Sequence, residues 1–389
     1  MASKVSIVRC SDYDKERVFC AVREGLDLIG GLIGYIKPGD KVFLKPNLLR
    51  ASSPEEGVTT HPAVVEAVAR LVNQAGGQVI IGDSPALPYT KACLKKVYAK
   101  CGLIEVAKET GAKLNYDTSS INLSYPEGDL MKMLTLIKVV LDVDTIINLP
   151  KLKTHVSAVF TGACKNLFGL VPGCTKAGYH GMLKNIENLS RMWIDIFTFL
   201  KQKLNILNIM DGIVGLEGDW KQGSQRKIGV ILSSTDSLAL DFVACKLVGI
   251  LPMSTPILRT AVKRRLISGR LEDIEIVGAS LYEVFISDFK PATGIATMEG
   301  FNRENLTFFQ NLMRPFFKRL LTLRPMPNPN ACLGCGNCRD VCPQDAITIV
   351  KGKAKIDEKA CIHCYCCYEV CPEKAIDLKQ PWLGRIVSG

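Results

Sequence analysis

The chain has 389 residues, of which 47% are hydrophobic, so it is long enough to form two or three domains with buried cores. It contains no uncharged apolar run of the length that crosses a membrane, so we expect a soluble protein. The formal net charge is +11, and residues 1–330 hold the excess, with 41 Lys and Arg against 31 Asp and Glu. This basic part favours an acidic partner protein or a small anionic substrate, and nucleic acid is a less favoured third choice.

Strand-length apolar runs alternate with helical patterns through residues 1–280. The pattern predicts a strand over residues 5–9, a helix over 14–35, a strand over 41–47, a helix over 61–77 and a strand over 78–85. Further strands are predicted over residues 144–150, 206–212, 227–234 and 273–278. Such alternation predicts a large α/β domain, with a parallel or mixed sheet and helices on both faces.

Polar residues follow five of these strands. They are Lys45, Pro46 and Asn47; Gly82, Asp83 and Ser84; Asn148, Lys151, Lys153 and His155; Asp211 and Gly212; and Ser233, Ser234 and Asp236. Open α/β sheets bind ligands at the carboxyl ends of their strands, so we expect these side chains to converge on a pocket. The alternative is that such residues simply end strands.

Residues 148–173 hold the densest group of candidate site residues. Lys151, Lys153 and His155 alternate, so on an extended segment they share one face and form a cationic row suited to carboxylate or phosphate. Lys165 follows in a glycine-bearing turn whose backbone amides could also hold an anion. No P-loop or dinucleotide fingerprint is present, so an ordinary nucleotide site is not supported. His155 is the preferred acid/base candidate, with a structural role as the alternative.

Asp211 and Glu217 are candidates for a carboxylate pair that moves a proton or binds a metal weakly, although turn chemistry around the neighbouring glycines explains them equally well. Of the other histidines, His61 precedes a proline at a helix start. We expect His180 to be solvated in a glycine-flanked loop and His363 to pack beside metal ligands.

Two copies of one cysteine pattern lie near the C-terminus. Residues 331–347 read ACLGCGNCRDVCPQDAI, and residues 360–376 read ACIHCYCCYEVCPEKAI. Both contain C-x2-C-x2-C-x3-C-P once Cys366 is set aside, because Cys366 falls where the first copy has Asn337. Zinc sites usually use two CxxC pairs and a longer loop, and a disulfide framework would need an exported chain, for which no signal peptide is seen. The pattern therefore favours iron–sulfur ligation.

Residues 330–380 closely resemble the two-cluster bacterial ferredoxins. The resemblance implies a small α+β domain with two 4Fe-4S clusters, because the fourth cysteine of each copy binds the other cluster in that family. It implies a first cluster held by Cys332, Cys335, Cys338 and Cys371 and a second held by Cys361, Cys364, Cys367 and Cys342. Cys366 is then a bystander thiol or, in the alternative, a substitute ligand after oxidative damage.

Over nearly the whole chain, the motifs KPNLL, THPAVVEAV, GDSPA, NLPKLKTH, GACKNLFGLVPG and MDGIVGLEG resemble the domain of unknown function 362 family, in its versions fused to a ferredoxin-like domain. The resemblance implies an iron–sulfur protein but names no reaction. One departure is the segment DWKQGSQRK after GLEG, which leaves the loop beside Glu217 undefined.

We therefore divide the chain into a basic α/β domain over residues 1–300, an amphipathic and proline-rich connector over 301–330, the two-cluster domain over 331–380 and a tail over 381–389. The expected function is electron transfer in the cytoplasm, and the cysteine content suggests an anaerobic or low-oxygen cell. The large domain would dock a redox partner (a ferredoxin, a reductase or an oxidoreductase subunit) or an anionic substrate.

Two alternatives remain open. The chain could be a reductase, an oxidoreductase with its own substrate bound by Lys45, Lys151, Lys153, His155 and Lys165. It could also be a non-catalytic iron–sulfur assembly protein or one associated with nucleic acid, although no nucleic-acid motif is present. An additional cofactor such as a flavin is left open.

Overall fold

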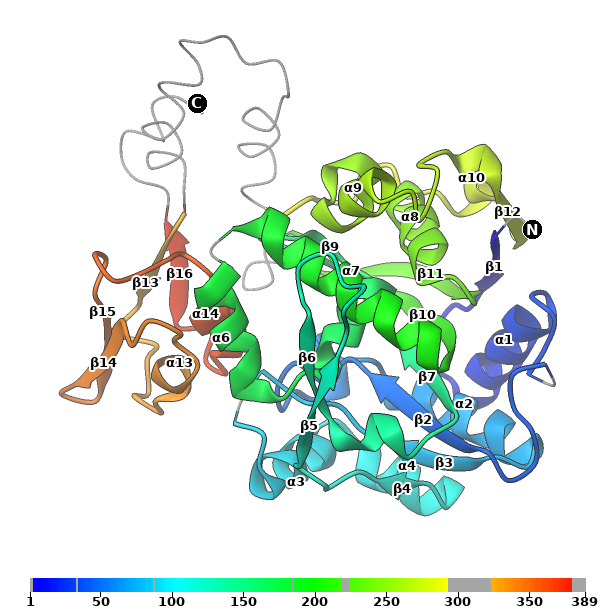
Figure 1. Cartoon of the computed structure of the whole chain (residues 1–389), viewed down its shortest axis with the longest axis horizontal. Coiled ribbons are helices and arrows are strands. Elements are labelled where there is room, and N and C mark those ends of the chain that lie inside the picture. The colour runs from blue at the N-terminus through cyan, green and yellow to red at the C-terminus, as the bar shows by residue number, and fades with distance from the viewer. Residues whose placement is uncertain are drawn as a thin grey trace, which may run out of the picture.

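The structure is a computed structural model that describes residues 3–32, 34–86, 88–183, 185–218, 224–292 and 323–379. The large domain contains a ten-stranded mixed sheet with the strand order β12-β1-β11-β10-β7-β2-β3-β4, in which β8 also pairs with β10 and β9 pairs with β8 (Figure 1). Its strands are β1 (Ser3–Arg9), β2 (Lys41–Pro46), β3 (Gln78–Ile81), β4 (Lys113–Leu114), β7 (Thr145–Leu149), β8 (Lys151–His155), β9 (Val159–Thr161), β10 (Asn205–Leu216), β11 (Gln225–Ser234) and β12 (Ile274–Gly278).

The central strands run in parallel, with Val42 of β2 opposite Thr145 of β7 and Asn205 of β10 also opposite Thr145. All five residues of β7 are buried, as expected for a strand covered by helices on both faces. β11 runs antiparallel to both β10 and β1, so the sheet is mixed. The predicted fold class of the large domain is therefore confirmed.

One face of the sheet is covered by α1 (Lys15–Asp27), α2 (Pro62–Gln74), α3 (Lys91–Lys100) and α4 (Leu103–Thr110), whose apolar residues form one core with β2, β3 and β7. Helix α1 is shorter than the helix predicted over residues 14–35. It begins after the N-cap Asp14, whose carboxylate accepts the Arg17 N–H. It ends before Gly30 and Gly31, which both have positive φ and leave the helical region.

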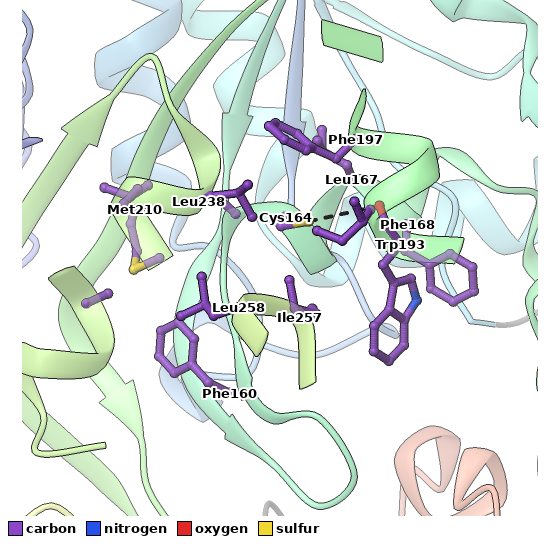
Figure 2. Packing of buried hydrophobic residues seen from close by; sticks show 14 of the residues in the cluster. Phe160, Cys164, Leu167, Phe168, Trp193, Phe197, Met210, Leu238, Ile257 and Leu258 are labelled. Carbon is purple, nitrogen blue, oxygen red and sulfur yellow. Dashed lines mark hydrogen bonds between the residues drawn. The ribbon is translucent and has the colours of Figure 1, made fainter. Parts of the chain in front are cut away.

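The other face is covered by α5 (Ala163–Asn166), α6 (Gly173–Leu183), α7 (Ile186–Lys203), α8 (Ser237–Leu247) and α9 (Pro256–Lys263), and beside them lies the hairpin of β5 (Ser120–Ser124) and β6 (Met133–Ile137). A second core lies under these helices, where Cys164, Phe168 and Trp193 pack together (Figure 2). Cys164 is 1% exposed, and its Sγ lies 4.0 Å from the Trp193 carbonyl oxygen, so it is a core residue.

The ferredoxin-like domain has two short antiparallel strand pairs and two short helices. β13 (Arg324–Pro327) pairs with β16 (Ile376–Lys379), and β14 (Ile347–Val350) pairs with β15 (Lys353–Ile356). α13 (Asn337–Asp340) and α14 (Cys366–Val370) occupy matching positions in the two copies of the cysteine repeat. In Figure 1, α14 faces α6 of the large domain, whereas β14 and β15 lie on the far side.

The connector predicted over residues 301–330 lies largely outside the described residues, as does the tail. Its last described part, Arg324–Pro327, is strand β13 of the ferredoxin-like domain. Among the described residues, no helix combines the length and the apolar character needed to cross a membrane.

Candidate functional site

A cavity of about 370 Å³ in the ferredoxin-like domain is lined by Cys332, Cys335, Cys338 and Cys371. Backbone amides surround these sulfurs: the N–H groups of Gly334 and Ala354 each donate to Cys332 Sγ at 3.4 Å, and the Ala375 N–H donates to Cys371 Sγ at 3.2 Å. Amide donors to sulfur tune thiolates that bind iron–sulfur clusters. The four thiols thus surround a space, as the corners of a cubane require.

The other four cysteines of the repeat, Cys342, Cys361, Cys364 and Cys367, are close enough to affect one another electrostatically. Burial, followed by the charges of Cys364 and Cys361, raises the pKa of the Cys367 thiol. Such a group of thiolates repels itself until a cation binds. In the described part of the chain, no three His, Cys, Asp or Glu side chains converge on the position of a single metal ion. The thiols of this second set nevertheless lie near one another.

Cys366, the cysteine without a counterpart in the first copy, lines a different cavity. Tyr365 precedes it with φ of 64°, the left-handed conformation that Gly336 adopts in the first copy. Helix α14 begins at Cys366, and its Cys366 and Glu369 line a pocket between the two domains. We call this cavity the interdomain pocket.

The interdomain pocket has a volume of about 720 Å³ including its open mouth. The large domain lines it with residues from the ends of β2, β3 and β9, from the segment 165–169 and from α6, among them Lys45, Asn47, Asp83, Ser84, Thr161, Lys165, Lys176 and His180. The ferredoxin-like domain contributes Val341, Cys366 and Glu369. The pocket is therefore rich in lysine and is bounded on one side by the segment that contains Cys367.

Two of its lysines are held by the ends of β2 and β3. Lys45 is fully buried, and its Nζ lies 2.8 Å from Asp83 Oδ1. Burial lowers the pKa of Lys45, although the charge of Asp83 opposes this effect. Lys176 on α6 donates a hydrogen bond to the Ser84 carbonyl oxygen. Gly169 packs so closely on the Lys45–Asp83 pair that a Cβ atom at this position would overlap both side chains.

Lys165 stands over the ring of Trp193, with its Nζ 5.3 Å from the ring centroid. Its pKa is lowered, chiefly by burial, while the negative charge of Glu369 counteracts the shift. No carboxylate of the described residues lies within ion-pair distance of Lys165. An anion in the pocket would favour the charged form of this lysine.

Two hydroxyl groups of the pocket wall lack a partner. Ser84 is 2% exposed and Thr161 is 4% exposed, and neither Ser84 Oγ nor Thr161 Oγ1 has a hydrogen-bond partner among the described residues. Buried polar atoms are normally hydrogen-bonded, and leaving one unpaired costs about 1–3 kcal/mol. A bound molecule with acceptor oxygens would satisfy both groups.

His155 joins the large domain to the ferredoxin-like domain. Its Nδ1 accepts hydrogen bonds from the N–H groups of Ser157 at 3.1 Å and Ala158 at 3.0 Å. Because Nδ1 accepts, the ring proton is on Nε2, which donates to Glu369 Oε1 at 2.8 Å. Burial, followed by the charge of Lys165, lowers the pKa of His155. Burial alone would raise the pKa of Glu369, but His155 and Lys165 hold it at about 2. The contact is thus a neutral imidazole bonded to a carboxylate.

A second cavity of about 520 Å³, the side pocket, adjoins the first and is lined in part by Lys153, Val58 and Leu216. Lys153 donates to Asn47 Oδ1 at 2.8 Å and to the Val58 carbonyl oxygen at 3.1 Å. Burial, with a smaller contribution from Lys165, lowers the pKa of Lys153 to about 7. Lys153 therefore titrates near neutral pH.

Lys151 is buried and belongs to another group of side chains. Its Nζ donates to Asp211 Oδ2 at 2.8 Å and to the Tyr13 hydroxyl at 2.7 Å. Asp211 also accepts the N–H of His61, and the His61 ring stacks on Tyr13 with centroids 3.7 Å apart. Neither Lys151 nor Asp211 lines the two pockets described above. Lys151, Lys153 and His155 therefore all lie on β8, but each of the three contacts different partners.

Glu217 has separate partners from Asp211. Its Oε1 accepts the Ser224 hydroxyl at 3.1 Å, and its Oε2 accepts the Lys290 N–H at 3.1 Å. These contacts brace the segment after β10. The structure thus does not bring the two carboxylates together around a shared group.

Five strand ends were expected to converge, and those of β2 and β3 do so at the interdomain pocket. Of the residues after β7, His155 lines this pocket and Lys153 lines the side pocket, but Asn148 and Lys151 line neither.

The expectation is wrong for the other two strands, β10 and β11. Asp211 lies in the middle of β10, which continues to Leu216. β11 runs antiparallel, and Asp236 after its end caps α8 by accepting the N–H groups of Leu238 and Ala239. Whether a strand runs parallel or antiparallel to its neighbours decides at which edge of the sheet its carboxyl end lies. The local sequence does not show this direction.

His180 was expected in a solvated loop, and this expectation is wrong. It lies on α6, four residues after Lys176, and faces Phe168 edge-on at 6.3 Å. Burial lowers its pKa to about 4, with Lys165 also contributing. Lys176 and His180 are four residues apart, so on a helix they lie on the same face. This spacing is the feature of the sequence that could have placed both residues in the wall of the interdomain pocket. No local signal pointed to Glu369, which reaches the pocket from the other domain.

Fold and site together define an iron–sulfur protein with a ferredoxin-like domain docked on an α/β domain. The chain belongs to the family described as domain of unknown function (DUF362), which it matches over residues 42–246. Residues 324–372 match the 4Fe-4S dicluster domain. The resemblance noted in the sequence is thereby confirmed for both parts.

Among curated proteins, the thylakoid-associated protein sll1697 of Synechocystis sp. is 34% identical over 262 residues, which cover 66% of this chain and 78% of that protein. Two solved structures are weakly similar. The lactate racemase apoprotein from Thermoanaerobacterium thermosaccharolyticum has 15% identity over 61% of this chain and a TM-score of 0.36. A Thermotoga maritima protein has 14% identity over 59% of this chain and a TM-score of 0.37. The match spans 54% and 57% of those chains, respectively.

Proposed function

We propose that this chain is an iron–sulfur oxidoreductase that carries two 4Fe-4S clusters and acts on a small anion bound in its large domain. In this proposal the first cluster is bound by Cys332, Cys335, Cys338 and Cys371 and the second by Cys342, Cys361, Cys364 and Cys367. Bound clusters of this type supply single-electron transfer. The dicluster domain match and the cavity among the first four thiols support the assignment.

The oxidoreductase proposal rests on one observation, which is that the ferredoxin-like domain forms a wall of the interdomain pocket. Cys366 and Glu369 line this pocket, and Cys366 is adjacent in sequence to Cys367. A molecule in the pocket therefore lies beside the segment assigned to the second cluster. A carrier that only docked other proteins would not require a lysine-rich cavity at this place, so we favour a reductase over a simple carrier.

The large domain binds the anion in this proposal. Lys165 provides the positive charge, and the hydroxyl groups of Ser84 and Thr161 donate hydrogen bonds. His155 is a positioning residue, because its two ring nitrogens are used by backbone amides and by Glu369. Lys153 lines the adjoining side pocket, while the buried Lys151–Asp211 pair and Glu217 support the strands that carry the site.

The first-cluster side of the ferredoxin-like domain is the proposed docking surface for a redox partner protein. Leu333 is 71% exposed there, and Cys335 is also exposed. Gly334 packs on the backbone of Gly352, and Lys351, which precedes Gly352, is exposed. An exposed apolar residue together with a cation suits an acidic electron-carrier protein.

Anaerobic iron and acid-labile sulfide analysis, combined with EPR of the reduced protein titrated with acetate and with phosphate, tests this function. We expect about eight iron and eight sulfide per chain. We also expect the EPR signal of one cluster to change when an anion binds. Zinc, or four iron atoms, would refute the two-cluster assignment. An EPR spectrum that no anion alters would refute the anion pocket.

A pair of lysine variants makes the test specific. Lys165→Met should abolish the anion response and leave the iron content unchanged. Lys201→Met is the control, because Lys201 Nζ lies over the Phe197 ring at 5.7 Å much as Lys165 lies over Trp193, but it is exposed and outside both pockets. An anion response that survives in Lys165→Met would remove this lysine from the site.

A further inference from the structure

We propose that the interdomain pocket and the side pocket together bind one organic anion, whose charged end lies in the interdomain pocket and whose apolar body lies in the side pocket. This inference rests on the proposed function, since it names the class of molecule that the site takes. It distinguishes a carboxylate or phosphate with a hydrocarbon body from an inorganic anion.

The two pockets are continuous along one wall. They share six lining residues: Asn47, Leu49, His155, Thr161, Lys165 and Glu369. Because these six residues form a common wall, a molecule bound in one pocket contacts residues that also line the other. A single molecule of moderate size can therefore occupy both.

Polar groups that have no hydrogen-bond or ion-pair partner among the described residues line the interdomain pocket. Ser84 lies in that pocket and Thr161 lies in the shared wall, and both hydroxyl groups are unpaired among the described residues. Lys165 adds a cation without an ion-pair partner in the same range of residues, and it also belongs to the shared wall. These groups suit the oxygens of a carboxylate or phosphate.

Among the residues that line the side pocket alone, by contrast, the polar side chains already have partners. Lys153 is bonded to Asn47 and to the Val58 carbonyl oxygen, and the Thr154 hydroxyl donates to the Gly218 carbonyl oxygen at 2.5 Å. What remains of its wall is apolar and consists of Leu49, Val58, Val156 and Leu216. A ligand gains affinity there by burying hydrocarbon and not by forming new hydrogen bonds.

An inorganic anion would occupy only the charged site of the interdomain pocket and would leave the side pocket without a ligand. It would satisfy Lys165 and the two hydroxyl groups but leave apolar walls in contact with water. A molecule with a hydrocarbon body removes that water, which stabilises the complex in proportion to the apolar area buried. Ligand sites generally combine apolar walls with a few placed polar groups, as these two pockets do together.

Ligand-observed NMR titration of the cluster-containing protein with acetate, butanoate and hexanoate tests the inference. All three carry the same charge, so only the apolar body changes. We expect the affinity to rise about fourfold for each added methylene that the side pocket buries. Val156→Thr and Val58→Thr replace one methyl of the wall with a hydroxyl and should each weaken hexanoate binding severalfold while leaving acetate binding unchanged.

Val350→Thr is the matched control, because Val350 is 49% exposed on β14 and lies outside both pockets. It should bind all three carboxylates as the parent protein does. Equal affinity for acetate and hexanoate would overturn the inference and leave the proposed anion pocket intact. Undiminished hexanoate binding in both pocket variants would overturn it as well. Failure of every carboxylate and of phosphate to bind would instead refute the proposed function itself.

Discussion

His155 of the large domain and Glu369 of the ferredoxin-like domain meet across the domain interface, with His155 Nε2 2.8 Å from Glu369 Oε1. The two side chains are 12% and 24% exposed, so the contact is largely shielded from water. Glu369→Ala should leave the Nε2–H without its acceptor and destabilise the docked ferredoxin-like domain by about 1–3 kcal/mol. Thermal loss of the visible cluster absorbance, recorded anaerobically, measures the effect.

Glu358→Ala is the control for this change, because Glu358 is an exposed carboxylate whose ion-pair partner, Arg324, lies in the same domain. It should lower the transition temperature by much less than Glu369→Ala. Equal transition temperatures in the two variants would show that the His155–Glu369 contact does not hold the domains together.

Gly169 keeps the Lys45–Asp83 pair in place by having no side chain. Gly169→Ala should push the two charged groups apart and destabilise the large domain by about 1–3 kcal/mol, and anion binding should weaken with it. Gly178→Ala on α6 is the matched control, because a Cβ atom there meets nothing within 4 Å. It should be neutral or stabilise the helix by about 0.5–1 kcal/mol. Denaturant unfolding of both variants measures the difference, and similar losses would contradict the packing argument.

Lys153 gives the stability a defined dependence on pH. Burial lowers its folded-state pKa to about 7, whereas an unfolded chain has the ordinary value of 10.5. Between these two values the unfolded state holds more protons than the folded state, so the free energy of unfolding rises as the pH rises. The slope from this residue approaches about 1.4 kcal/mol per pH unit in that window.

Lys153→Met lacks this titration, so its free energy of unfolding should rise less between pH 7 and pH 9 than that of the parent protein. Lys201→Met, at an exposed position of α7, should retain the parent slope. Denaturant titrations at both pH values give the comparison. The same pH slope in the parent protein and in Lys153→Met would show that Lys153 keeps an ordinary pKa in the folded chain.

Cys366 and Cys367 are neighbours with different roles in our proposal. Cys366→Ser should retain about eight iron atoms per chain, because Cys366 lines the interdomain pocket and is not in the proposed ligand set. Cys367→Ser should lose about four, since it removes a proposed ligand of the second cluster. Iron analysis of both variants after anaerobic purification is decisive. Loss of iron in Cys366→Ser, with retention in Cys367→Ser, would show that Cys366 and not Cys367 is the ligand of the second cluster.

The cysteine repeat and the alternation of strands and helices could be recognised from the sequence, because each is a pattern within a short stretch of the chain. Cluster ligands such as Cys332 and Cys335 are spaced within one short loop, and a buried strand such as residues 145–149 is a short apolar run with turn residues after it. Neither depends on how distant parts of the chain meet. The family resemblance and the fold class followed from these local patterns and are confirmed.

The composition of the pocket was decided only by tertiary structure. Lys151 and Lys153 are two residues apart on one strand, yet one is paired with a buried carboxylate and the other opens onto a cavity. Glu369 enters the site from a domain about 200 residues away in sequence, and burial then sets which groups carry charge. Strand direction, domain docking and desolvation are long-range properties, so residue spacing alone could nominate the lysines and His155 but could not assign their partners.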